Sequence, residues 1–359
     1  MKKTLLLLLL FLTAAVRLPC SPLKFVDARQ LTLGGKLMPT PANPYHRVDT
    51  ALYKGFTRGE LEEVLQPTGL TVFFRTNSSR VDVHAVYNSL SNGVTSGGIA
   101  QRGFDLYIRE GGRWQYARAN VGKVGKEGNR VAIITGMDRT DHECMLYLPL
   151  RSELASLEIG VDADASIEAI PSPMRHRIAI FGSSFTQGAG TSRPGMLYSS
   201  QFMRMTGYDI LNLGCSGNAK LQPYFAEVLA GSDVEAILVD GFSNSAAGVI
   251  RERLLPFIGI IRAKQPDTPI IFLSTIYRES RHFSRSVDKV EREKREAVEE
   301  MMALAQKQFR HVYFVEVNAS DPDRETSVDG THPSDWGYRL WAESMVRPVR
   351  KILSRYGIK

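Results

Sequence analysis

The sequence predicts two domains of different fold class, a β-sandwich over residues 25–172 and an α/β domain over residues 177–359. The first reason is that the periodicity of the apolar residues changes near residue 172. The second is length, because the 359 residues exceed the roughly 250–300 at which a single hydrophobic core stops growing. A stretch with two prolines, residues 170–176, fits a linker between the domains.

The first domain is predicted from short runs in which apolar and polar residues alternate. These runs are rich in Val, Ile, Tyr and Phe, and turn-forming stretches such as "EGG" and "KEGN" separate them. Regularly spaced strands without intervening helices are typical of a β-sandwich or jelly roll. The predicted strands are 70–76, 80–87, 104–110, 113–119, 130–136, 144–150 and 155–162. Residues 55–66 are expected to form a short surface helix or a loop.

In the second domain, apolar runs alternate with helical stretches. Strands that are almost continuously apolar are buried on both faces, as in a parallel sheet covered by helices. The predicted strands are 178–182, 209–214, 235–241, 269–275 and 312–317. The predicted helices are 196–206, 222–230, 246–264, 287–309 and 335–355. In such sheets, binding sites form at the carboxyl ends of the strands.

Residues 1–20 have the pattern of a secretory signal peptide: two lysines, a short apolar run and then small residues. The apolar run is too short to span a membrane comfortably, and no later segment has the length and hydropathy of a transmembrane helix. Two ways of processing this signal remain open: lipidation of Cys20 in a lipoprotein signal, or cleavage after Ala14 or Ala15. Both predict a secreted, periplasmic or cell-surface protein.

The net charge, the cysteines and the histidines indicate whether a nucleic-acid partner, a disulfide or a metal site is to be expected. The formal net charge is 45 − 38 = +7, and loss of Lys2, Lys3 and Arg17 with the signal leaves 42 − 38 = +4. This mild charge indicates no nucleic-acid partner. Cys144 and Cys215 are predicted to be buried rather than paired in a disulfide. The seven histidines show no ligand spacing, so no metal site is predicted.

Residues able to perform ester hydrolysis follow the predicted strands. Ser184 comes just after the first strand, Gly217 follows the second and Asn244 follows the third. Asp329 and His332 lie in the loop before the last helix. A serine nucleophile needs a base, a group that orients the base, and donors for an oxyanion. Taken singly, each residue also fits an ordinary turn, a glycine-rich loop or a helix cap.

Taken in order, the segments "FGSSFTQG", "GCSGN", "DGFSN" and "DGTHP" resemble the four sequence blocks of the SGNH (GDSL-type) hydrolase family. The resemblance extends to a bacterial subgroup with an N-terminal β-sandwich. It implies a flavodoxin-like three-layer α/β/α fold with an open site. It also implies a Ser184–His332–Asp329 triad and an oxyanion hole formed by the Ser184 N–H, the Gly217 N–H and the Asn244 side chain. No cofactor is required.

Three positions depart from the family pattern. Ser183 stands where the first block usually has aspartate. In the third block, Phe242 replaces the usual glycine and Ser245 replaces the final aspartate. None of these changes removes a group that performs chemistry, but they indicate a divergent subgroup.

The predicted function is that of a serine esterase, specifically a carbohydrate acetyl esterase that removes O-acetyl groups from glycans. A lipase, a phospholipase or a thioesterase of the same fold is an alternative, as is an inactive glycan-binding surface protein. Two features remain ambiguous. The basic stretch 277–302 either borders the site or forms a solvated helix face. The following aromatic residues form either a sugar platform or part of the packing: Trp114, Tyr116, Trp336, Tyr338 and Trp341.

Overall fold

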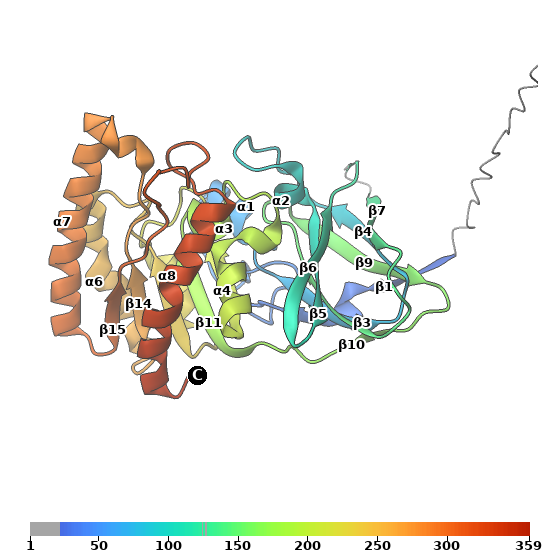
Figure 1. Ribbon diagram of the computed structural model, residues 1–359. Coiled ribbons are helices and arrows are strands. Elements are labelled where there is room, and N and C mark those ends of the chain that lie inside the picture. Colours follow the sequence, from blue (N-terminus) through green and yellow to red (C-terminus); the bar gives the residue numbers. More distant parts are fainter. Residues whose placement is uncertain (1–21, 124, 126–127) are drawn as a thin grey trace, which may run out of the picture.

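The computed structural model describes residues 22–123, 125 and 128–359. The predicted signal peptide, with Cys20, lies outside these residues. Figure 1 shows a β-rich domain packed side by side with a domain of helices and sheet. Among the described helices, none has both the length and the apolar character needed to cross a membrane.

The N-terminal domain consists of two antiparallel sheets, so the predicted β-sandwich class is confirmed. One sheet has the order β1-β9-β4-β7, and the other has the order β10-β3-β8-β5-β6 with β2 paired to β3. The strands are β1 Leu23–Asp27, β2 Thr32–Gly34, β3 Thr71–Thr76, β4 Arg80–Tyr87, β5 Phe104–Glu110, β6 Arg113–Asn120, β7 Asn129–Thr135, β8 His142–Tyr147, β9 Leu154–Asp162 and β10 Ile167–Ala169. The helices are α1 Arg58–Val64 and α2 Gly98–Arg102, with a 3-10 turn at Ala28–Gln30.

Strand β3 of the second sheet is buried on both of its faces, which explains why its sequence is so apolar. Val72 and Phe74 point into the core of the sandwich. Phe73, which lies between them, packs into a core of the C-terminal domain. The two domains therefore share apolar packing through β3.

The C-terminal domain has a five-stranded parallel sheet of order β12-β11-β13-β14-β15. The strands are β11 Arg175–Gly182, β12 Tyr208–Gly214, β13 Ala236–Asp240, β14 Ile270–Leu273 and β15 Val312–Val315. The helices are α3 Ser184–Gln187, α4 Tyr198–Thr206, α5 Pro223–Ala230, α6 Ala247–Lys264, α7 Arg285–Gln308 and α8 Asp335–Leu353, with 3-10 turns at Pro194–Met196, Glu279–His282 and Ser354–Tyr356.

Side chains alternate between the two faces of the sheet along strand β11, and a layer of helices covers each face. Ile178 and Ile180 join the apolar core shared with α4 and α8. Ala179 and Phe181 join the core on the opposite face, shared with α5, α6 and α7. Helices thus cover both faces of the sheet (Figure 1), as predicted for an α/β/α domain.

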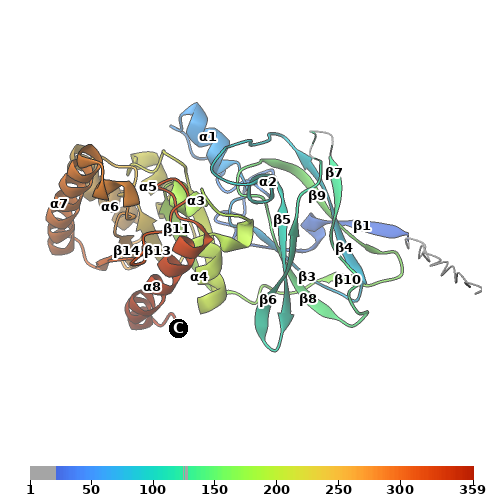
Figure 2. The ribbon, with the colours of Figure 1, turned by 45° about the horizontal axis from the view of Figure 1, so that its top comes forward.

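The expectation of a short surface helix or a loop over residues 55–66 is met by helix α1, most of whose side chains are at least partly exposed. Helix α1 forms, with a capping box at Thr57 and Glu60. However, Leu37, Met38 and Val64 are buried in the same core as Phe181 of the C-terminal domain. Figure 2 shows α1 beside the start of α5. This part of the N-terminal domain is therefore built into the C-terminal domain.

The two described cysteines behave as predicted. Cys144 and Cys215 are free and buried. Cys144 packs in the sandwich core and Cys215 in the core beneath helix α5, so both act as small apolar side chains.

Candidate active site

The register of the parallel sheet brings the three strand-end residues to one edge. Gly182, the last residue of β11, pairs with Gly214 of β12 on one side and with Asp240 of β13 on the other. Ser184 follows the central strand of these three, while Gly217 and Asn244 follow its two neighbours. Because parallel strands end at the same edge, the loops that carry these residues adjoin.

Ser184, His332 and Asp329 form a continuous chain of hydrogen bonds. Ser184 Oγ lies 2.9 Å from His332 Nε2, and His332 Nδ1 lies 2.7 Å from Asp329 Oδ2. The serine is the first residue of α3, and the other two lie 148 and 145 positions later in the chain. The arrangement has the geometry in which an imidazole accepts the proton of a serine hydroxyl while a carboxylate orients the imidazole.

The loop that carries Asp329 and His332 is tightly folded. Gly330 has a φ of +80°, a conformation that glycine adopts without strain. Asp329 Oδ1 accepts hydrogen bonds from the backbone N–H groups of Thr331, at 2.9 Å, and His332, at 2.7 Å. The carboxylate thus holds both the backbone and the ring of His332.

The same contacts keep Asp329 ionised. Partial burial acts to raise its pKa, but the hydrogen bonds from the backbone and ring of His332 and from the Thr331 N–H outweigh that effect. The pKa of Asp329 therefore lies below its ordinary value of 3.8. The Asp329 carboxylate can therefore accept the hydrogen bond from His332 Nδ1 near neutral pH without first losing a proton.

Three hydrogen-bond donors lie at this edge of the sheet without a partner among the described residues. The Ser184 N–H is at the start of α3, where helix geometry leaves it free. Gly217 has a φ of +72°, its N–H has no hydrogen-bond partner among the described residues, and a side chain at this position would meet no atom within 4 Å. Asn244 makes no side-chain hydrogen bond, and its Oδ1 is buried. Such donors suit the negative charge of a tetrahedral intermediate.

The side chain of Asp240 binds the hydroxyl of Ser183, the residue that replaces the usual aspartate of the first block. The Asp240 carboxylate is fully buried, and its Oδ2 accepts hydrogen bonds from Ser183 Oγ at 2.8 Å and Thr186 Oγ1 at 3.1 Å. Its Oδ1 accepts one from Ser243 Oγ at 2.6 Å. Burial raises the pKa of Asp240, although these hydrogen bonds oppose the shift. Ser183 also caps α3 by accepting from the Phe185 N–H. The carboxylate beside the serine loop thus comes from β13 rather than from position 183.

We expect Ser183→Asp, which restores the residue usual in the family, to destabilise this protein. It would place a second carboxylate against Asp240, and two neighbouring buried carboxylates cannot both ionise. The expected loss in the free energy of unfolding is roughly 1–3 kcal/mol, measured by urea denaturation. Adding Asp240→Asn should recover part of that loss. Equal stability of Ser183→Asp and the wild type would contradict this account.

The other two departures have local structural explanations. Phe242 is fully buried and stacks on Phe272 of β14, with ring centroids 5.5 Å apart. Ser245 donates from its hydroxyl to the Gly241 carbonyl at 2.8 Å, which closes the turn around Asn244. Neither residue displaces Asn244 from the edge of the sheet.

Arg47 is a residue of the site region that the sequence prediction missed. It belongs to the N-terminal domain and is only 1% exposed. Its guanidinium donates to the carbonyls of Gly214, at 2.9 Å, and Asn212, at 3.2 Å, at the end of β12. It also donates to the carbonyls of Glu63 and Gln66 beside α1. Arg47 therefore fastens α1 to the strand that leads to Gly217.

Side-chain amides extend this attachment to the loop of Gly217. Gln187 Nε2, at the end of α3, donates to Gln66 Oε1 at 2.7 Å, while its Oε1 accepts from the Ser216 N–H at 2.9 Å. Asn218 Nδ2 donates to Glu63 Oε2 at 3.0 Å. The residues on both sides of Gly217 are thus held by groups from α1 or α3.

The ambiguous aromatic residues divide into two pairs, while the fifth, Trp114, is partly buried and packs near Phe73. Tyr338 and Trp341 are fully buried, and both stack on Tyr198. Trp336 and Tyr116 are about half exposed, at 51% and 50%. The first pair belongs to the packing of α8 against α4, which leaves Trp336 as the aromatic residue of α8 that faces solvent.

The basic stretch also has two parts. Along α7, exposed ion pairs such as Arg295–Glu299 form the solvated face. In contrast, Arg278 and Lys294 are largely buried and share Glu291, and both donate to the Ser243 carbonyl next to Asn244. The stretch therefore borders the loop of Asn244 through Arg278 and the buried face of α7, while the opposite face of α7 is solvated.

Comparison with known proteins agrees with this geometry. A sequence profile of the GDSL-like lipase/acylhydrolase family matches residues 175–350, and a profile for the N-terminus of SGNH-hydrolase-type esterases matches residues 23–167. The crystal structure of a GDSL-like lipase from Bacteroides ovatus is 36% identical, with a TM-score of 0.88, over 93% of this chain and 98% of that one. The chain belongs to the SGNH (GDSL-type) hydrolase family. It is accordingly an ester-bond hydrolase.

More distant solved structures share the fold. A salicylyl-acyltransferase from a tetracycline biosynthetic pathway is 22% identical, with a TM-score of 0.67, over 94% of this chain and 98% of that chain. A family two carbohydrate esterase from Clostridium thermocellum, solved in complex with cellohexaose, is 15% identical, with a TM-score of 0.58, over 80% of this chain and 96% of that one. No sequence among the curated proteins matches the chain.

Proposed function

We propose that this SGNH hydrolase is a carbohydrate acetyl esterase in which Ser184 is the nucleophile, His332 the general base and Asp329 the residue that orients it. The N–H groups of Ser184 and Gly217 and the side-chain amide of Asn244 form the oxyanion hole. In the same proposal, residues 1–20 direct export from the cell, and the substrate is an extracellular acetylated glycan.

The proposed reaction proceeds through an acetyl-enzyme. His332 Nε2 takes the proton of Ser184 as Oγ bonds to the acetyl carbon, and the carbonyl oxygen becomes an oxyanion. The bond to the sugar oxygen then breaks, and His332 returns the proton to that oxygen. His332 takes a proton from water as the water oxygen bonds to the acetyl carbon. His332 then returns the proton to Ser184 Oγ as its bond to the acetyl carbon breaks, and acetate leaves.

The observation that carries the choice of a small acyl group is the small number of aliphatic side chains in the cavities beside the catalytic loop. Two cavities of the described part of the chain adjoin the loop of His332, with volumes of about 540 and 410 Å³. Ile99 is the only aliphatic residue lining the first, while Val287 and Val290 are the only ones lining the second. A long acyl chain needs a continuous apolar wall, whereas an acetyl group does not. Similarity to a carbohydrate esterase fold supports the sugar part of the proposal.

We expect a strong preference for short acyl chains. With 4-nitrophenyl esters, kcat/KM for the acetate should exceed that for the octanoate by about tenfold or more, because the additional methylenes find no apolar surface to bury. The measurement is steady-state hydrolysis below the micelle-forming concentration of the octanoate. A preference for the octanoate would favour the alternative of a lipase or thioesterase and overturn the proposal.

A further inference from the structure

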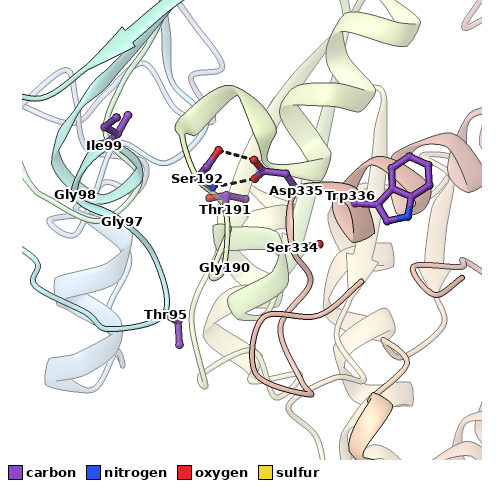
Figure 3. A pocket seen from close by; sticks show the side chains of 10 residues that line it. All are labelled: Thr95, Gly97, Gly98, Ile99, Gly190, Thr191, Ser192, Ser334, Asp335 and Trp336. Carbon is purple, nitrogen blue, oxygen red and sulfur yellow. Dashed lines mark hydrogen bonds between the residues drawn. The ribbon is translucent and has the colours of Figure 1, made fainter. Parts of the chain in front are cut away.

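The larger of the two cavities lies between the domains. One wall comes from the N-terminal domain, with Thr95, Gly97 and Ile99 at the start of α2. The other wall comes from residues 190–192 and from the start of α8. Figure 3 shows Ser192 and Asp335 joined by hydrogen bonds in the middle, with Trp336 on the side opposite Thr95 and Ile99.

This cavity adjoins the segments that carry the triad. Its Gly190 lies three residues beyond α3, the helix that begins at Ser184. Gly190 also packs against the residue after His332, since a side chain at this position would come within 2.4 Å of the Pro333 carbonyl oxygen. The Gly190 N–H donates to Ser96 Oγ at 2.9 Å, which fastens the loop of the N-terminal domain at the same point. A molecule in the cavity therefore contacts both domains next to the catalytic loop.

The lining has the chemistry of a site for an uncharged, hydroxyl-rich ligand. Hydroxyl groups come from Thr95, Thr191, Ser192 and Ser334, and the only charged lining residue is Asp335. The last three hydroxyls already donate within the protein, so toward a ligand they act as acceptors, whereas Thr95 has no hydrogen bond among the described residues. The Asp335 carboxylate already accepts from the N–H and hydroxyl of Ser192. No lysine or arginine lines the cavity to pair with an acidic sugar.

Trp336 adds an aromatic surface at the edge of the cavity. Its indole Nε1 donates to Asp321 Oδ2 at 3.0 Å, which fixes the ring, yet the side chain is half exposed. A fixed aromatic ring open to solvent offers an apolar face for the C–H groups of a pyranose, while nearby hydroxyls hydrogen-bond to its O–H groups.

We propose that this interdomain cavity binds the neutral sugar units that adjoin the acetylated sugar of an oligosaccharide substrate. The N-terminal domain then supplies one wall of the substrate site. The inference rests on the proposed carbohydrate esterase function and adds the location and charge class of the glycan.

Two variants test the proposal from opposite walls. Trp336→Ala removes the aromatic surface. Gly97→Phe introduces bulk where a new side chain meets no atom within 4 Å and where a φ of −68° accepts any residue. Val94→Phe is the matched control, because Val94 lies in the same loop, is 99% exposed and does not line the cavity.

The probe is the acetylated neutral oligosaccharide, from xylo-, manno- and cello- series, on which the wild type has the highest kcat/KM. The quantity compared is the ratio of kcat/KM for this oligosaccharide to kcat/KM for 4-nitrophenyl acetate. We expect each cavity variant to lower the ratio by about 3- to 10-fold through a higher KM, the range for loss of one aromatic contact. The Val94→Phe control should keep the wild-type ratio, with melting temperatures confirming that all variants fold.

The inference is overturned if both cavity variants keep the wild-type ratio, or if they lose both activities in parallel. It is also overturned if an acetylated glycan rich in uronic acid is a better substrate than every neutral one. Failure of the proposed function gives a different result, because the wild type itself would then hydrolyse 4-nitrophenyl acetate and release no acetate from any glycan.

Discussion

Replacing Ser184 by alanine is expected to lower kcat for 4-nitrophenyl acetate on the order of 10⁴- to 10⁶-fold. The hydroxyl is the group within hydrogen-bond distance of His332 Nε2, and its loss leaves the imidazole without a nucleophile to activate. The fold should persist, because the bond to His332 is the only hydrogen bond of the Ser184 hydroxyl among the described residues.

The neighbouring serine provides the matched control. Ser183→Ala removes a hydroxyl one position earlier, which caps α3 and donates to Asp240. Loss of such a cap typically costs about 1 kcal/mol of stability, so this variant should retain most of its activity. If Ser184→Ala kept more than about a hundredth of the wild-type kcat, or if Ser183→Ala were the inactive variant, Ser184 would not be the nucleophile.

Asp329→Asn should lower kcat by roughly 10³- to 10⁴-fold at neutral pH. Asp329 Oδ1 accepts from two backbone N–H groups, so the oxygen of an asparagine would take that place and its NH₂ would face His332 Nδ1. The ring would then carry its proton on Nε2 and could no longer accept the proton of Ser184. KM should change little, since the substrate does not contact this group.

Asp323→Asn is the control for the charge change, because Asp323 lies in the same connection between β15 and α8 and is exposed. Its activity should equal that of the wild type. The measurement is kcat for 4-nitrophenyl acetate across neutral pH. A loss smaller than about tenfold in Asp329→Asn would mean that another group fixes the tautomer of His332.

Much of the fold follows from the sequence because the strands are either alternating or continuously apolar. The five parallel strands and the helices between them lie within a few residues of their predicted ranges. Strand β1 was missed because all five of its residues are only half-buried, so its pattern has no periodicity. Strands β2 and β10 have three residues each, which is too short for a periodic signal.

The site residues predicted from the order of motifs come together, but their supporting contacts were not predictable. Arg47 hydrogen-bonds to backbone carbonyls 165 and 167 positions away. Such contacts cannot be predicted from the sequence, because every residue has a backbone carbonyl whatever its side chain. The attachment of α1 to the C-terminal domain was not predicted, because its contacts, such as that of Glu63 with Asn218, join residues far apart in the sequence. In the sequence, Asp240 stood out only as part of the third motif. Its hydrogen bond with Ser183 was not predictable, because it depends on the pairing of β11 with β13.

The N-terminal domain contributes directly to the structure around the active site. Arg47 and Gln66 fasten the loops of Gly217 and Ser184, while the start of α2 lines the cavity beside His332. The sandwich domain therefore supports the loops of Gly217 and Ser184 on one side of the site and lines the cavity beside His332 on the other.

The most direct test of the central claim is acetate release from a panel of acetylated polysaccharides and oligosaccharides, with Ser184→Ala as the blank. The panel should include neutral and acidic glycans, and free acetate is measured by an enzyme-coupled assay. The account predicts that the wild type releases acetate from at least one neutral glycan while Ser184→Ala releases none above background. Equal release by the two proteins, or no release from any glycan by an enzyme that hydrolyses 4-nitrophenyl acetate, would contradict it.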